Sequence, residues 1–192
     1  QEGLEVLVMN RQGQLRCLAG STGDLVWETS IPGRLQWGET VLALGDVNGD
    51  GALEIVTGDQ DGVVVCLNGA GELVWQYRGQ HGITQAPALA DLTGDGMMEV
   101  LVGGNLIPLV CLSHEGKELW KLDSGIGGNP LVYDITKDGT PEILIGVGVN
   151  LTVLDAKGAV DWTYQMQREM DGALTVADAN EDGEVEIYLV DL

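Results

Sequence analysis

The chain contains 192 residues, of which 44% are apolar, so it can bury a sizeable hydrophobic core. It carries 30 Asp and Glu residues against nine Lys and Arg residues, which gives a formal net charge of −21. Such an acidic surface repels phosphate backbones and anionic lipids, and no apolar run is long enough to span a bilayer. We therefore expect no nucleic-acid partner and no membrane insertion.

Glycine accounts for 29 residues, whereas phenylalanine is absent. Glycine supplies the positive φ angles that tight turns require, so this composition predicts many short strands joined by tight turns. The first predicted strand is LEVLV, beginning at Leu4, and the next two contain Cys17 and Trp27. The segments that follow, ETVLALGDV, LEIVTG, VVVCLNG and ELVWQY, are short, rich in β-branched residues and bounded by glycine, which is typical of strands.

The sequence repeats itself along its whole length. The acidic segments DVNGDGALE, DLTGDGMME, DITKDGTPE and DANEDGEVE begin at Asp46, Asp91, Asp134 and Asp178, with steps of 45, 43 and 44 residues. A tryptophan keeps the same period, at Trp27, Trp75, Trp120 and Trp162. A period near 45 residues is typical of a propeller blade or of a helical array. Apolar residues nowhere follow the spacing of an amphipathic helix, so the blade is favoured.

We therefore predict an all-β fold, a β-propeller of four-stranded antiparallel blades with about four to four and a half blades in this chain. The repeats run over about 1–37, 38–82, 83–126, 127–171 and a partial repeat, 172–192. These form a single propeller domain or part of a larger propeller. The chain is expected to open and close on the second strand of a repeat, and such a surplus strand favours a larger ring or pairing with another chain.

Each acidic segment places oxygen-bearing side chains at alternate positions. In the first one these are Asp46, Asn48, Asp50 and Glu54, while Gly51 allows a sharp turn that can direct the Ala52 carbonyl inward. Hard oxygen ligands without neighbouring His or Cys favour calcium over softer metals. The pattern resembles the first part of an EF-hand loop, but the EF-hand glutamate at position 12 is absent and the flanks are strands.

The predicted ligand set contains positions 1, 3, 5, 7 and 9 of every loop, which would hold up to four Ca²⁺ ions. The full set is Asp46, Asn48, Asp50, Ala52, Glu54, Asp91, Thr93, Asp95, Met97, Glu99, Asp134, Thr136, Asp138, Thr140, Glu142, Asp178, Asn180, Asp182, Glu184 and Glu186. The alternative is a set of solvated Asp-Gly turns. Four loops in register, with three acids each, favour the metal, because crowded carboxylates repel one another without a cation. Loops with threonine at position 3 are expected to bind calcium more weakly.

The D-x-[NT]-x-D-G-x-x-E loops resemble those of the FG-GAP, or VCBS, repeat family, which includes the integrin α-subunit propellers. The segments CLAGSTGDLVW and VLDAKGAVDW also resemble PQQ-like propeller repeats, in which a tryptophan docks one blade on the next. The resemblance implies that calcium rigidifies the hairpins and that the propeller is a platform for adhesion or for carbohydrate or protein binding. The sequence departs from the family in lacking its Phe-Gly motif and in having few blades.

The loops opposite the acidic turns are longer and more varied, and variable loops on a rigid scaffold commonly carry binding sites. Their polar and aromatic residues form a candidate ligand face: Arg34, Trp37, His81, Gln85, Asn129 and Arg168. Trp37 has two interpretations, a packing residue or a ligand contact. The periodic tryptophans are interpreted as blade-packing residues, and Cys17, Cys66 and Cys111 as small buried strand residues.

Two functions remain open at this point. The first is a calcium-binding module for binding, adhesion or structural assembly, placed extracellularly, on the cell surface or in the periplasm, where calcium is abundant. Its partner would be a protein or a carbohydrate, or another copy through the terminal strands. The second is a propeller enzyme, such as a polysaccharide lyase or a quinone-dependent dehydrogenase. No nucleophile–base pair is visible, so the first is favoured and we expect no enzymatic activity.

Overall fold

The computed structural model describes residues 3–10, 12–31, 42–104, 107–168 and 174–189. Over this part of the chain the fold is all-β, and none of it is helical. No helix suited to crossing a membrane is therefore found among these residues. The strands are β1 (Glu5–Met9), β2 (Gln14–Ala19), β3 (Leu25–Ser30), β4 (Leu42–Gly45), β5 (Glu54–Gly58), β6 (Val63–Leu67), β7 (Leu73–Arg78), β8 (Ala88–Ala90), β9 (Glu99–Gly104), β10 (Ile107–Leu112), β11 (Glu118–Gly125), β12 (Gly127–Tyr133), β13 (Glu142–Val147), β14 (Asn150–Leu154), β15 (Val160–Gln165), β16 (Thr175–Ala177) and β17 (Glu186–Tyr188).

The strands pair only with their neighbours in the chain, always antiparallel. The described residues form one three-stranded sheet, β1-β2-β3, three four-stranded sheets, β4 to β7, β8 to β11 and β12 to β15, and one two-stranded sheet, β16-β17. These sets match the strand order predicted from the sequence, including the second strand of a repeat at each end. The prediction of four-stranded antiparallel sheets is thereby confirmed.

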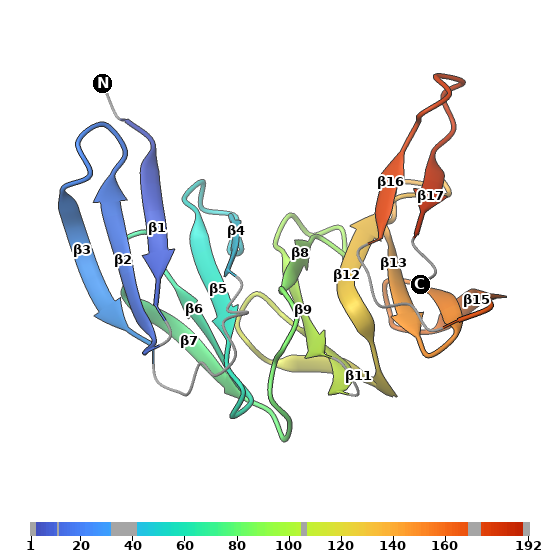
Figure 1. Cartoon of the computed structure of the whole chain (residues 1–192), viewed down its shortest axis with the longest axis horizontal. Coiled ribbons are helices and arrows are strands. Elements are labelled where there is room, and N and C mark those ends of the chain that lie inside the picture. The colour runs from blue at the N-terminus through green and yellow to red at the C-terminus, as the bar shows by residue number, and fades with distance from the viewer. Residues whose placement is uncertain (1–2, 11, 32–41, 105–106, 169–173, 190–192) are drawn as a thin grey trace.

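The five sheets follow one another in chain order along an arc, from β1–β3 at one end to β16–β17 at the other (Figure 1). The first strands of successive four-stranded sheets are neighbours, because β4 contacts β8 and β8 contacts β12. The turns between β2 and β3, between β4 and β5 and between β16 and β17 all lie along the upper edge of this view. The chain therefore presents two distinct edges, each built from a different class of turn.

The hydrophobic core is divided into four clusters, each filling the space between two consecutive sheets. Between the β4–β7 and β8–β11 sheets, for example, Val56, Val64 and Cys66 meet Val100 and Leu112, and all five side chains are fully buried. Equivalent clusters join the first sheet to the second, the third to the fourth and the fourth to the fifth. Each sheet is thus stabilised by its neighbours rather than by a separate core of its own.

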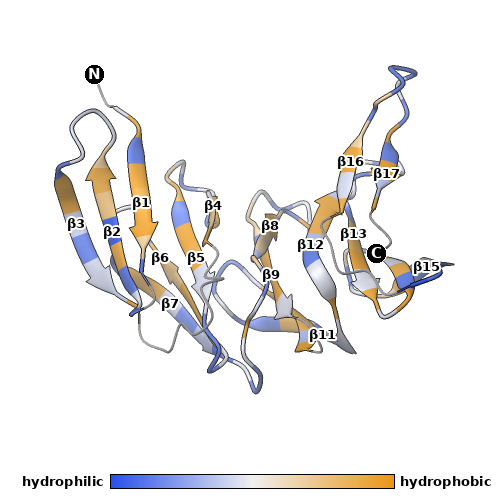
Figure 2. Ribbon diagram, viewed as in Figure 1, coloured by the Kyte–Doolittle hydropathy of each residue, from blue (hydrophilic) through white to orange (hydrophobic). Residues whose placement is uncertain are grey.

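The middle strands of the four-stranded sheets are buried on both faces. β6 and β9 are buried at every residue. Their sequences therefore do not alternate between apolar and polar residues, and apart from Glu99 they contain no polar side chain. Figure 2 shows this apolar character along β5 and β13 as well. Cys17, Cys66 and Cys111 are buried free thiols in equivalent strands, as predicted. Burial raises the pKa of Cys66 and of Cys111 to about 12, so these thiols are unreactive.

Three of the periodic tryptophans dock one sheet on the next, joining the first four sheets in order. Trp75 donates its indole N–H to the His114 carbonyl at 2.7 Å, and its ring covers Gly116, where a Cβ atom would lie 2.5 Å from a ring atom. Trp27 makes the same contacts with Gly69 and Gly71. Trp120 makes them with the next turn. The glycine is required twice over, because its φ of +76° at Gly116 lies in the left-handed region.

We expect Trp75→Ala to lower the free energy of unfolding by about 2–3 kcal/mol, because it removes both the ring packing and a hydrogen bond between sheets. Chemical denaturation followed by circular dichroism measures the loss. The matched control is Trp162→Ala, since Trp162 is 41% exposed and should contribute little. Equal losses in the two variants would contradict the docking role.

Candidate metal-binding turns

The four acidic segments form the turns that lead from the first to the second strand of successive sheets. They connect β4 to β5, β8 to β9, β12 to β13 and β16 to β17. In each turn the aspartate at position 1 directly follows the last residue of one strand, and the glutamate at position 9 is the first residue of the next strand. The fold therefore brings the predicted ligands of each loop into one compact turn.

The aspartates of these turns hold the backbone in place. In the first loop, Asp46 accepts the N–H of Asp50 at 3.0 Å and the N–H of Gly51 at 2.9 Å through its two carboxylate oxygens. Asp50 in turn accepts the Ala52 N–H at 2.8 Å. The same three hydrogen bonds recur in the other three loops. The aspartates thus shape the turn as well as supplying candidate ligand oxygens.

The glutamates at position 9 point inward from the start of the second strand. Glu54 and Glu99 are 2% exposed, and each accepts the N–H of the residue at position 2, Val47 or Leu92, at 2.8 Å. Glu142 and Glu186 make the same bond in the remaining loops. This closure uses one carboxylate oxygen, Oε2, so the glutamate is a structural acceptor as well as a predicted ligand. The sequence pattern did not reveal this role.

The glycine at position 6 adopts a positive φ in all four loops, for example +89° at Gly51, as predicted for the sharp turn. Position 4 also lies in the left-handed region, which the sequence analysis overlooked. It is glycine in the first two loops, but Lys137 and Glu181 take φ values of +59° and +62° in the last two. A non-glycine residue there is strained, so the surrounding hydrogen bonds must hold it.

The third loop brings its carboxylates together most closely. Oxygen atoms of Asp134, Asp138 and Glu142 all lie within 4.8 Å of one another, a spacing at which one cation could contact all three. Among the described residues this is the only cluster of three such groups at that spacing. In this loop Thr136 donates its hydroxyl to Glu142 at 3.1 Å. Convergence of three hard anionic oxygens suits a calcium ion.

The side chains at position 3 differ between the loops. Asn48 and Asn180 turn their amide oxygens onto the N–H of the aspartate at position 5, at 2.9 Å in each case. At position 7, Ala52, Met97, Thr140 and Glu184 donate their N–H groups to that aspartate. The expectation that loops with asparagine at position 3 bind calcium more tightly than loops with threonine remains a prediction. The most closely spaced carboxylates lie in a loop with threonine, the third.

Neighbouring loops also contact one another. The ammonium group of Lys137, in the third loop, reaches the fourth loop, where it pairs with Glu184 at 2.9 Å and donates a hydrogen bond to the Gly183 carbonyl. The bond to the Glu184 carboxylate, followed by the charges of the acids nearby, raises the pKa of Lys137. On the other side, the Met98 N–H of the second loop donates to the Val47 carbonyl of the first at 3.0 Å. The first acidic turn is therefore joined to the second, and the third to the fourth.

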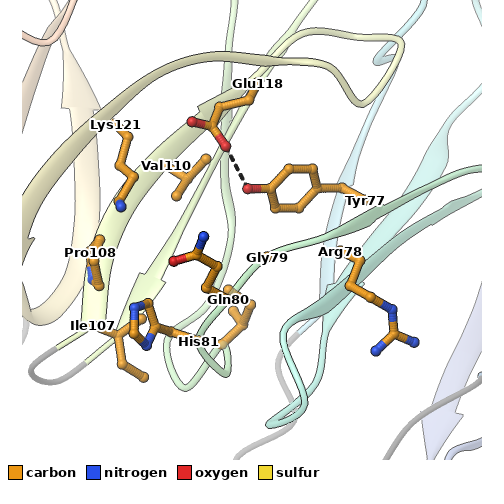
Figure 3. A pocket seen from close by; sticks show the side chains of 11 residues that line it. Tyr77, Arg78, Gly79, Gln80, His81, Ile107, Pro108, Val110, Glu118 and Lys121 are labelled. Atoms are coloured by element: carbon orange, nitrogen blue, oxygen red, sulfur yellow. Dashed lines mark hydrogen bonds between the residues drawn. The ribbon is translucent and has the colours of Figure 1, made fainter.

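The opposite edge of the molecule holds a groove between the second and third sheets (Figure 3). Its volume is about 240 Å³. Tyr77 donates its hydroxyl to Glu118 across the groove at 2.7 Å, and burial followed by this bond raises the tyrosine pKa to about 12. The remaining lining residues combine apolar and hydrogen-bonding side chains, namely Arg78, Gly79, Gln80, His81, Ile83, Ile107, Pro108, Val110 and Lys121.

The predicted ligand face is only partly assembled. His81 lines the groove, and Asn129 accepts the backbone N–H of Ala86 at 3.0 Å, which places it beside Gln85 in the same loop region. Arg168 is exposed near the end of β15. Arg34 and Trp37 lie outside the described residues. Tyr77, Gln80 and Lys121 were missed by the sequence analysis because they lie in or beside strands, and only the docking of two sheets brings them together.

One buried carboxylate among the described residues lies outside the acidic loops, near the groove. Asp59, in the turn between β5 and β6, is 1% exposed, and its Oδ1 accepts the Val63 N–H at 2.7 Å. Its Oδ2 is buried without a hydrogen-bond partner among the described residues. In the corresponding turn of the first sheet, Asn10 donates its Nδ2 to Gln14. Desolvation raises the pKa of Asp59, despite the opposing backbone hydrogen bonds.

Together these features define an all-β repeat protein whose sheets each carry an acidic turn. Comparison with solved structures shows the same fold in BamB from Moraxella catarrhalis, with a TM-score of 0.66 and 20% identity over 93% of this chain and 53% of that one. Quinohemoprotein alcohol dehydrogenase from Comamonas testosteroni gives a TM-score of 0.68 and 16% identity over 97% of this chain and 38% of that one. Rhamnogalacturonan lyase YesW gives 0.68 and 18% identity over 92% and 35%.

These structural neighbours are β-propellers, and at this level of identity they establish the fold alone. Residues 46–102 match the family model described as FG-GAP-like repeat, which confirms the resemblance that the acidic loops suggested. The match begins at the acidic turn between β4 and β5 and ends within β9. No curated protein matches this sequence. The chain spans about half the length of BamB and less of the two enzymes.

We expect the position 9 glutamates to stabilise the fold even without metal. In calcium-free buffer, Glu99→Leu should lower the free energy of unfolding by about 1–3 kcal/mol, because the buried Leu92 N–H loses its acceptor. Glu99→Gln keeps an acceptor oxygen and should cost clearly less. Urea denaturation of both variants measures the difference, with Glu72→Gln as a control at an exposed turn. Identical costs for Gln and Leu would contradict the structural role.

Asp59→Asn should raise the unfolding temperature by a few degrees at pH 7, because it removes a buried charge and keeps the Oδ1 acceptor. The folded-state pKa of Asp59 is raised, so its ionisation costs stability. This loss begins as the pH rises above the unfolded-state pKa and is complete above the folded-state pKa. The gain over the wild type should therefore shrink as the pH falls through the pKa. Thermal denaturation between pH 4 and pH 7 tests this. Asp24→Asn, which removes an exposed turn charge, should show no such trend.

Proposed function

We propose that this chain is a calcium-binding β-propeller module that serves in binding, adhesion or structural assembly and has no catalytic role. The observation that carries the proposal is the cluster of Asp134, Asp138 and Glu142, which lies in a turn whose hydrogen bonding is repeated in three other turns. A geometry repeated four times, with three acids in each copy, is better explained by a common ligand than by chance turn chemistry.

The residues present suit calcium. All candidate ligands are oxygens from carboxylates, amides, hydroxyls and backbone carbonyls, and calcium accepts six to eight such oxygens in loose geometry. In the third loop Asp138 is exposed and Asp134 is intermediate in burial, so water can complete the coordination shell. A cation would also relieve repulsion among the acids, which amounts to about 4 kcal/mol for two charges 4 Å apart at an effective dielectric of 20.

Up to four ions would be bound, one in each acidic turn. In each turn the glutamate at position 9 already accepts a backbone N–H without metal. Calcium would therefore stabilise a hairpin that is already formed. Four ions would change the formal charge from −21 to −13. That change reduces the self-repulsion of a strongly acidic surface, and it gives calcium a general stabilising effect beyond its direct ligands.

We place the protein outside the cytoplasm, in an extracellular, cell-surface or periplasmic setting. Calcium modules of extracellular proteins commonly bind at about 10⁻⁴–10⁻³ M, concentrations that the cytosol does not reach. The exposed turns of this chain, with three carboxylates each, suit that weaker class of site. Measured calcium affinities test this placement, because a nanomolar affinity would favour a cytosolic calcium buffer instead.

The ligand of the module is proposed to be a protein or a carbohydrate that contacts the edge opposite the acidic turns. This edge carries the groove of Figure 3, in which apolar groups such as Ile107 and Pro108 lie beside Gln80, His81 and Lys121. Mixed apolar and hydrogen-bonding linings are typical of ligand sites. Screening against glycan and protein arrays, with Gln80→Ala and Lys121→Ala as variants, tests whether the groove is used.

The alternative is a propeller enzyme, a polysaccharide lyase or a quinone-dependent dehydrogenase. Two structural neighbours favour keeping it as a second candidate, since one is a quinohemoprotein alcohol dehydrogenase and another a rhamnogalacturonan lyase. Both of those proteins are much longer than this chain. Lyase assays on pectic polysaccharides and dye-linked alcohol oxidation with added quinone would separate this alternative from the binding module.

Calcium should raise the unfolding temperature of the protein, and Asp138→Asn should reduce that rise. A site held at 100 times its dissociation constant adds about 2.7 kcal/mol to the free energy of unfolding. The matched control is Asp155→Asn, because Asp155 also accepts two backbone N–H groups in a turn but lies outside the acidic loops. Differential scanning calorimetry with calcium and with chelator measures both variants.

Two results would contradict the calcium proposal. One is an unfolding temperature that does not respond to calcium at millimolar concentration, and the other is an equal loss of response in Asp138→Asn and Asp155→Asn. Magnesium at the same concentration separates a specific calcium effect from general screening of the acidic surface.

A further inference from the structure

The groove between the second and third sheets is lined by hydrogen-bond donors that the chain itself does not use. Gln80 and His81 are exposed, and neither side chain forms a hydrogen bond or an ion pair with another described residue. Lys121 pairs with Asp123 at 2.7 Å, and the Asp123 side chain is 82% exposed. In Figure 3 the Lys121 and Gln80 side chains extend toward the same space, one from β11 and the other from the loop after β7.

The groove also holds a large share of the few cationic groups in the chain. The sequence has nine Lys and Arg residues and two histidines against 30 acids. Arg78, Lys121 and His81 all line the groove, whereas Glu118 is the one carboxylate among its described lining residues. Arg78 lies apart from the other two in Figure 3, so Lys121 and His81 are the basic groups that converge with Gln80.

A rigid apolar surface lies beside these donors. The Tyr77 ring packs against the core between the two sheets, and its hydroxyl donates to Glu118 of the facing sheet at 2.7 Å, so the orientation of the ring is fixed. Ile107 and Pro108, at the start of β10, are partly exposed and line the same groove. Such a surface suits a ligand with C–H groups on one face and oxygen atoms around its rim, which is the chemistry of a sugar ring.

The backbone of the loop after β7 is already engaged with the neighbouring turn. Gly79 donates its N–H to the Gly62 carbonyl at 2.7 Å, and Ile83 donates its N–H to the Asp59 carbonyl at 2.6 Å. A peptide that adds to a protein as an extended strand needs free main-chain groups of this kind. The loop instead presents side-chain donors at fixed places, which favours a compact ligand over a polypeptide.

We propose that this groove binds a sugar that carries a carboxylate, namely a hexuronate unit of an acidic polysaccharide. Lys121 and His81 would donate hydrogen bonds to the carboxylate and Gln80 to the hydroxyl groups, while the apolar face of the sugar lies against Tyr77 and Pro108. The inference rests on the proposed function, because it names the kind of carbohydrate that the groove recognises. A volume of about 240 Å³ is below the roughly 300–1,000 Å³ of drug-sized sites, which suits one sugar unit.

The charge of the whole molecule makes the local cations decisive for an anionic ligand. A net charge of −21 repels anions at long range, so a carboxylate is held only where donors meet it at close range. The ion pair between Lys121 and Asp123 lies at the surface and is therefore weak. A ligand carboxylate can take the place of Asp123 at little cost.

Nuclear magnetic resonance titration of the whole isotope-labelled chain tests the proposal, with glucuronate, its neutral parent glucose, and acetate as probes. Glucuronate should shift the amide signals of Gly79, Gln80 and His81. It should also bind about tenfold more tightly than glucose, because its hydrogen bond to Lys121 joins two charged groups. Acetate has the charge without the ring, so it should bind more weakly than glucuronate.

Variants of two similar lysines separate the groove from general surface charge. Lys121→Met should remove the preference for glucuronate over glucose and leave the affinity for glucose unchanged. The matched control is Lys117→Met, because Lys117 also pairs with an acid two residues away, Glu115, but lies outside the groove. Asp123→Asn should strengthen glucuronate binding, since it frees the Lys121 ammonium, and a gain of affinity does not arise from misfolding.

The titrations are run with calcium and again with a chelator, because a carboxylate can also bind through a calcium ion held in an acidic turn. The groove should bind glucuronate equally well in the two conditions. Binding that is lost with the chelator would assign the sugar to the acidic turns and overturn the proposal.

Three further results would overturn it. They are equal affinities for glucose and glucuronate, tighter binding of an acidic peptide such as triglutamate, and an equal loss of preference in Lys117→Met and Lys121→Met. If glucose or the peptide still shifts the groove signals, only the hexuronate assignment fails and the binding module stands. If no probe shifts them, the groove fails as a ligand site, whereas the calcium proposal is judged separately by calorimetry.

Discussion

The structure depends on the contact between consecutive sheets. The middle strands of the four-stranded sheets are buried on both faces, so each of these sheets is stabilised by a neighbour on each side. The four core clusters of the described residues all lie between sheets. The tryptophan contacts add direction to this packing, because an indole N–H and a single carbonyl fix how one sheet is rotated against the next. Apolar burial supplies the free energy, and the hydrogen bond supplies the register.

The acidic turns can be understood from the same constraint. A sheet whose inner residues are packed on both sides needs short, well-defined connections at its edges. The paired hydrogen bonds of the aspartates, together with the buried glutamate, close the turn between the first two strands without any metal. The carboxylates would therefore be used twice, because an oxygen that accepts a backbone N–H keeps a second lone pair for calcium in our proposal. This division explains why the turns are already formed in the structure.

Much of the fold could be predicted because the signal is repeated. The acidic segments and the tryptophans fixed the period, and the strand order followed from it, including the buried cysteines. The role of Glu54 and its equivalents could not be predicted, since a buried acceptor and a metal ligand have the same sequence pattern. The groove at Tyr77 and Glu118 could not be predicted either, because these residues are 41 positions apart in sequence and meet only where two sheets dock. Asp59 differs from the equivalent Asn10 by one side-chain atom, Oδ2 in place of Nδ2. Only the structure shows that this oxygen is buried without a hydrogen-bond partner among the described residues, whereas the Asn10 nitrogen donates to Gln14.

The lysine that joins two acidic turns has a consequence for how metal would load. The ammonium of Lys137 is a cation that belongs to the third turn but rests among the anionic groups of the fourth. An ion entering the fourth turn would repel this ammonium, and the released side chain would then swing toward solvent or back to its own turn. In our proposal the filling of the third and fourth turns would consequently be negatively coupled, so that an ion in one would weaken binding in the other. A tethered charge would in this way set an order among sites that look alike in sequence.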